Sequence, residues 1–186
     1  MSHYKVAILG HSQVPLNFPQ IPEVELRIYR KSGAKLKHFD QYPEFQEIFI
    51  WSHKHNIIFL GSNDVSTGHN PMSADDIATK LINIAKKLHE LGQTVHIVQI
   101  EPRHFNIPFV QDFYRSECDK VNRRLKRYIR PVHQRIYRTI HFNSVPFQEA
   151  HISDGVHFNS VSVQCIIEKM VNAITYSREA YLLQHS

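Results

Sequence analysis

A series of short apolar runs, each ending beside glycine or a small polar residue, limits what this chain can fold into. YKVAILG (4–10), HNIIFLG (55–61) and TVHIVQI (94–100) are nearly continuous in apolar character. Runs of this length and composition are typical of strands in a parallel sheet that is buried on both faces. Residues 24–30 alternate apolar with polar side chains and predict a further strand, and residues 138–143 predict a fifth.

Helical patterns lie between these strands. Ser73 is a good N-cap, and the apolar positions from 77 to 91 recur at helical spacing. We expect a second long helix within residues 109–130 and a third after Val161, whereas the prolines of 15–22 predict an irregular loop. Strands that alternate with helices predict an α/β fold with a parallel sheet covered on both faces.

Composition narrows the classes of protein further. The chain has 186 residues, of which 21% are charged and 42% hydrophobic, as in a single globular domain spanning 1–186. Its two cysteines, Cys118 and Cys165, are far apart, which disfavours a disulfide framework and favours a reducing environment. With no signal-like start and no apolar stretch of membrane-spanning length, the expected location is intracellular and cytoplasmic.

Two other classes of site are disfavoured by missing motifs. The sequence contains no GxGxxG or Walker-type loop, which argues against a nucleotide-binding α/β protein. Fourteen histidines raise the question of a metal, yet no HExxH or cysteine–histidine spacing occurs, so no metal site is expected.

Small polar groups follow three of the predicted strands at the point where each ends. They are Gly10-His11-Ser12, Ser32-Gly33 and Gly61-Ser62-Asn63. Because the carboxyl ends of parallel strands meet at one edge of the sheet, where ligands bind in such folds, we expect these groups to lie together.

The stretch SDGVHFN (153–159) places Asp154 three positions before His157, just ahead of the last helical pattern. A carboxylate this close can fix the imidazole tautomer and leave the second ring nitrogen as a base. We interpret Ser12 as the nucleophile, His157 as its base and Asp154 as the orienting acid. The alternative is a surface turn, because Asp-Gly is a common turn pair and loop histidines are usually solvated.

Attack by Ser12 on an acyl carbonyl would develop negative charge on the carbonyl oxygen, which requires fixed hydrogen-bond donors. The backbone N–H groups of Ser12 and Gly33 and the side-chain amide of Asn63 are the candidates for this oxyanion hole.

In these motifs the sequence resembles the SGNH (GDSL-type) hydrolases, whose four blocks contribute a serine, a glycine, an asparagine and a histidine. Gly10-His11-Ser12 matches the first block, Gly33 the second, Gly61-Ser62-Asn63-Asp64 the third and Asp154-Gly155-Val156-His157 the last. The first block usually has an acidic residue where this chain has His11. The resemblance implies a flavodoxin-like three-layer α/β/α sandwich with a five-stranded sheet in the order 2-1-3-4-5, and serine-dependent hydrolysis of carboxylic esters without a cofactor.

The small size, the lack of a signal and the basic surface are similar to the esterase domains encoded by the first open reading frame of some LINE retrotransposons. The expected substrate is a carboxylic ester with an acetyl or a short or medium acyl chain, and a lipid ester is one form that it could take.

A run of basic residues within the second long helix offers a different function. It comprises Arg115, Lys120, Arg123, Arg124, Lys126, Arg127 and Arg130. This run is either the solvated face of the helix or a contact for nucleic-acid phosphates or anionic lipid headgroups. The alternative to an esterase is therefore a binding module that keeps the fold and uses this basic face.

Overall fold

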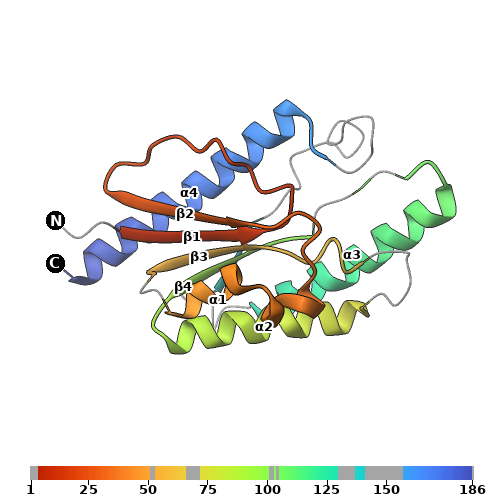
Figure 1. The fold of residues 1–186 in the computed structure, drawn as a ribbon, viewed down its shortest axis with the longest axis horizontal. Helices are drawn as coiled ribbons and strands as arrows, with labels where there is room; N and C mark the ends of the chain where they lie inside the picture. The colour runs from red at the N-terminus through yellow and green to blue at the C-terminus, as the bar shows by residue number, and fades with distance from the viewer. Residues whose placement is uncertain are drawn as a thin grey trace.

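The computed structural model describes residues 4–50, 53–65, 72–100, 103, 105–129, 137–140 and 157–185. The elements follow one another as β1 (Tyr4–Gly10), β2 (Val24–Arg30), the 3-10 helix η1 (Leu36–Gln41), α1 (Pro43–Ile50), β3 (His55–Phe59), α2 (Ala74–Glu90), β4 (Thr94–Val98), α3 (Pro108–Tyr128), β5 (Tyr137–Ile140) and α4 (Ser160–His185). The chain therefore alternates strands with helices, as the hydrophobic pattern predicts (Figure 1).

The strands form a parallel sheet in the order β2-β1-β3-β4-β5. Ile8 at the centre of β1 pairs with Ile28 of β2 on one side and with Ile57 of β3 on the other. The strands β1 and β3 are almost wholly buried, which accounts for their nearly continuous apolar sequences. The predicted α/β fold with a parallel sheet is confirmed.

Two strands end earlier than their apolar sequences predict. β3 ends at Phe59 and β4 at Val98, each two residues before the end of the apolar run. β5 is described over residues 137–140, and the rest of the predicted strand at 138–143 lies outside the described residues. After β3, Gly61 has φ +117°, outside the range of a strand. After β4, the N–H and C=O of Ile100 bond to the side chain of Asn122 in α3 at 2.9 and 3.2 Å, so this backbone is paired with a helix and not with the sheet.

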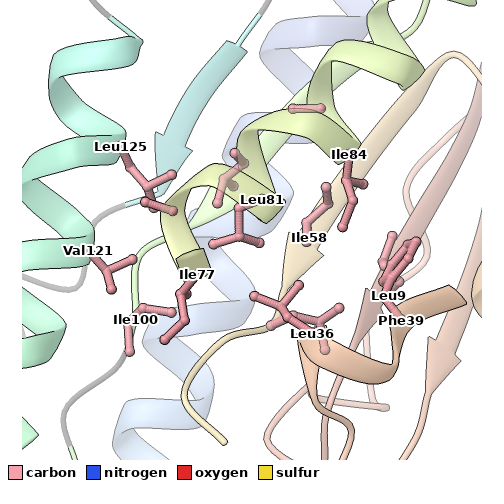
Figure 2. Packing of buried hydrophobic residues seen from close by; sticks show 14 of the residues in the cluster. Leu9, Leu36, Phe39, Ile58, Ile77, Leu81, Ile84, Ile100, Val121 and Leu125 are labelled. Carbon is pink, nitrogen blue, oxygen red and sulfur yellow. The ribbon is translucent and has the colours of Figure 1, made fainter. Parts of the chain in front are cut away.

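Helices cover both faces of the sheet. Figure 1 shows α4 on one side and α1, α2 and α3 on the other. The larger apolar cluster joins the sheet to α2 and α3, and Figure 2 shows Ile77 and Leu81 of α2 between Ile58 of β3 and Leu125 of α3. The smaller cluster lies under α4 and includes Ile166, Met170, Ile174, Val6, Ile8 and Ile57.

The helix boundaries follow from capping. Ser73 accepts a hydrogen bond from the Asp76 N–H at 3.1 Å and starts α2, as predicted. Asn159 caps α4 in the same way, accepting from the Ser162 N–H at 2.9 Å, so that this helix starts before the predicted Val161. The prolines of 15–22 lie in a connection without helix or strand. Among the described residues, none of the helices combines the length and apolar character needed to cross a bilayer.

Candidate active site

The loop that carries Ser12 begins at the carboxyl end of β1, where the backbone passes very close to its neighbours. A Cβ on Gly10 would lie 2.4 Å from Val14 Cγ2 and 2.5 Å from the Phe59 carbonyl oxygen, so only glycine fits. The loop is tied to the end of β2 by two bonds: the Lys31 N–H donates to Gly10 O at 3.0 Å, and the Arg30 guanidinium donates to Ser12 O at 2.6 Å. Ser12 itself is partly exposed, at the edge of the sheet where ligands bind in such folds.

Asn63 joins the loop after β3 to the loop after β2. Its Nδ2 donates to the carbonyl oxygen of Ala34 at 2.9 Å, directly beside Gly33. Gly33 is exposed, and Asn63 is partly buried. The structure therefore brings Gly33 and Asn63, two of the predicted oxyanion-hole residues, into adjacent loops. The loop with Gly33 follows β2, and the end of β2 is bonded to the Ser12 loop.

His11 is fully buried, whereas Ser12 beside it is partly exposed. Its Nδ1 accepts from the Gln13 N–H at 3.3 Å, and its Nε2 lies 3.0 Å from Ser62 Oγ. Since Nδ1 is an acceptor, Nε2 carries the proton and donates it to Ser62. The histidine thus connects the Ser12 loop to the loop after β3, and its ring packs against the Phe59 ring in a tilted arrangement with the centroids 5.1 Å apart. This gives a structural role to the residue at which the sequence departs from the SGNH pattern.

Arg103 is a site residue that the sequence alone does not indicate. Its Nη2 donates to Ser62 Oγ at 3.1 Å and to Asn63 Oδ1, and its guanidinium lies 5.9 Å from the centre of the Tyr114 ring. It follows β4 without a recognisable motif. The signal that could have revealed it is its position, since it stands just beyond the carboxyl end of a predicted strand.

Asp64 is buried, and its carboxylate joins the loop after β3 to the start of η1. Its carboxylate accepts from the N–H of Leu36 at 2.8 Å and from that of Lys37 at 3.3 Å, which are the first groups of η1. Burial raises the pKa of Asp64, and these two donors oppose the rise. The 3-10 helix has no side-chain cap of its own, so Asp64 caps it from the next strand loop.

His157 lies two residues before Asn159, the cap of α4, and is exposed. The adjacent Phe158 packs against the cluster under α4, to which Val14 of the Ser12 loop also belongs. Asp154, the third member of the predicted triad, lies outside the described residues. The structure thus brings the Ser12, Gly33 and Asn63 loops together, while the assignment of His157 and Asp154 stays a prediction.

Solved structures of similar fold are known, although no protein-family model and no curated protein sequence matches the chain. A member of the lipolytic protein G-D-S-L family from Veillonella parvula has a TM-score of 0.69 at 17% identity, covering 92% of this chain and 98% of that one. The lipase/acylhydrolase from Enterococcus faecalis has a TM-score of 0.68 at 15% identity, with coverages of 91% and 94%. A GDSL-like lipase from Bacteroides thetaiotaomicron has a TM-score of 0.65 at 15% identity, with coverages of 94% and 89%.

At these identities the likeness is one of fold. The chain has an α/β fold whose parallel sheet matches that of the GDSL/SGNH hydrolases, and the match extends over nearly the whole of both chains.

Proposed function

We propose that this protein is a serine esterase that hydrolyses carboxylic esters at Ser12. The observation that carries the proposal is the joining of three strand-end loops. Arg30 and Lys31 of the β2 end hold the Ser12 loop, and Asn63 bonds to Ala34 beside Gly33. The proposal is supported because the proposed nucleophile and two proposed oxyanion donors lie on connected loops, in a fold shared with lipases and acylhydrolases.

The reaction proceeds in two displacements. Ser12 Oγ attacks the acyl carbon while His157 takes the hydroxyl proton, with Asp154 orienting the imidazole. Negative charge develops on the former carbonyl oxygen and is stabilised by the N–H groups of Ser12 and Gly33 and by the Asn63 amide. The C–O bond to the alcohol then breaks, and the alcohol leaves with the proton from His157. His157 then deprotonates a water molecule, which attacks the acyl-serine. The bond between the acyl carbon and Ser12 Oγ breaks, His157 returns the proton to Ser12 Oγ, and the carboxylic acid is released.

The substrate class is an ester of a short or medium acyl chain. The steps above involve only side chains, backbone N–H groups and water, so the proposed mechanism uses no cofactor. A lipid ester is the narrower form of this proposal.

The test is a covalent label together with a variant. A fluorophosphonate should form an adduct that mass spectrometry locates on Ser12, and a short-chain aryl ester should be hydrolysed. Ser12→Ala should lose both the label and the hydrolysis while keeping its melting temperature, whereas Ser116→Ala, on the exposed side of α3, should keep both. Hydrolysis at the wild-type rate by Ser12→Ala would exclude Ser12 as the nucleophile.

A second candidate function is binding of a polyanion by α3, and one observation favours it. Arg123, Arg124, Lys126 and Arg127 are all exposed near the end of this helix. Arg124 forms an ion pair with Asp75 of α2, which partly neutralises this face, and Arg130 lies outside the described residues. Binding to single-stranded RNA or to anionic vesicles should weaken steeply as salt increases and should survive Ser12→Ala. Binding that is insensitive to ionic strength would contradict this candidate.

A further inference from the structure

Arg103 holds the Asn63 side chain at its oxygen end. The guanidinium Nη2 donates to Asn63 Oδ1, and the opposite end of the amide, Nδ2, donates to Ala34 O at 2.9 Å. An amide rotated by 180° would place its NH₂ against a cation and its oxygen against a carbonyl oxygen. Both contacts of the rotated amide would be repulsive, so Arg103 and Ala34 together select a single orientation.

This orientation determines where the remaining amide hydrogen points. Nδ2 carries two hydrogens, and only one of them can lie along the bond to Ala34 O. The second therefore has a fixed direction, which a free asparagine on a loop would lack. Donors that are fixed before the reaction stabilise developing charge without reorganising, and this is the main source of oxyanion-hole catalysis.

The same arginine nitrogen also fixes the neighbouring residue. Nη2 donates to Ser62 Oγ at 3.1 Å, and Ser62 Oγ lies 3.0 Å from Nε2 of His11. Tyr114 supports the arrangement from α3, with its ring 5.9 Å from the guanidinium and its hydroxyl 3.5 Å from Ser62 O. Arg103 thus lies against an aromatic ring and is bonded to two side chains of the loop after β3.

We propose that Arg103 is a positioning residue, which acts on the reaction by holding the Asn63 amide in the orientation that donates to the oxyanion. This inference rests on the proposed hydrolysis at Ser12. Because the oxyanion exists only in the transition state and the tetrahedral intermediate, loss of this positioning should appear in kcat and not in KM.

The first measurement uses Arg103→Met, which keeps the length of the side chain and removes its charge and donors. We expect kcat for a short-chain aryl ester to fall about 100-fold, the lower range seen when one oxyanion donor is lost, with KM changed less than about threefold. Arg103→Lys keeps the charge and a nitrogen with enough hydrogens for both bonds, and should recover kcat to within about tenfold of wild type. Arg27→Met, which removes a part-buried arginine bonded to Glu25 in β2, is the matched control and should be as active as wild type.

A double-mutant cycle separates positioning from a general structural effect. Once Asn63→Ala has removed the amide, Arg103→Met should lower kcat by less than about threefold more, because the group it positions is gone. A further loss of more than about tenfold in that background would overturn the inference. Should Arg103→Met fail to fold, Arg103→Gln takes its place in the same cycle with the same thresholds.

Failure of the inference is distinguishable from failure of the proposed function. Wild-type protein that neither turns over an ester nor labels at Ser12 would refute the hydrolysis itself. Wild-type protein that does both, with Arg103→Met equally fast, would refute only the role of Arg103.

Discussion

Replacing Asp64 with alanine should destabilise the protein far more than the loss of a surface carboxylate. The side chain is 2% exposed and accepts from the N–H groups of Leu36 and Lys37 at 2.8 and 3.3 Å. Alanine would leave both donors unpaired at the start of η1, where no local side chain can replace the acceptor. Each unsatisfied donor costs about 1–3 kcal/mol, and relief of the buried charge offsets part of this, so we expect a net loss of about 2–4 kcal/mol.

Urea unfolding followed by circular dichroism provides the measurement. With a denaturant slope of roughly 2 kcal/mol per molar, the expected loss lowers the midpoint by about 1–2 M. Asp119→Ala, which removes an exposed carboxylate from α3, is the control and should change stability by less than about 0.5 kcal/mol. If Asp64→Ala were no less stable than this control, the N–H groups of Leu36 and Lys37 would not need Asp64 as their acceptor. The proposed link between the loop after β3 and η1 would then be wrong.

Three further predictions follow from other contacts. Burial raises the pKa of Asp64 above its ordinary 3.8, so the folded protein binds this proton more tightly than the unfolded chain does. The stability of the wild type relative to Asp64→Asn should therefore be greatest below pH 3.8 and should decrease as the pH rises above it. Urea titrations that show the opposite trend would refute the shift. Gly10→Ala should lower the free energy of unfolding by about 1–3 kcal/mol, because the new Cβ would lie 2.5 Å from the fixed Phe59 carbonyl oxygen. An unchanged melting temperature in thermal unfolding would contradict this. Asn159→Ala should lower the free energy of unfolding by about 1 kcal/mol, because it removes the cap of α4. Hydrogen exchange should become faster at the Ser162 amide and stay unchanged at the Asp76 amide of α2.

The elements that the sequence predicts well are those whose cause is local. The strand at 4–10 is a continuous apolar run, and the helix that starts after Ser73 has a cap and a helical hydrophobic period. Both are found where they are predicted. The adjacency of Gly33 and Asn63 also follows from a local rule, since both stand just beyond the ends of parallel strands.

The features that the sequence does not predict depend on partners far along the chain. β4 ends early because Ile100 bonds to Asn122, 22 positions away, and no periodicity within the strand reports that contact. Arg103 stands between a proline and a histidine and belongs to no motif. Its role depends on the hydrogen bond from its guanidinium to Asn63, 40 positions earlier in the chain. The 3-10 helix η1 is likewise absent from the sequence pattern, because its cap comes from Asp64 and not from its own first residues.

Among the described helices, α4 covers one face of the sheet and α1, α2 and α3 cover the other, which has a consequence for synthesis. The ribosome delivers Val6 and Ile8 long before Met170 and Ile174, which help to shield them on that face. A nascent chain can assemble the other layer earlier, but much of one side of β1 and β3 stays open to water until α4 has been translated. During that interval the growing polypeptide offers an adhesive apolar surface, which is the kind of surface that chaperones bind.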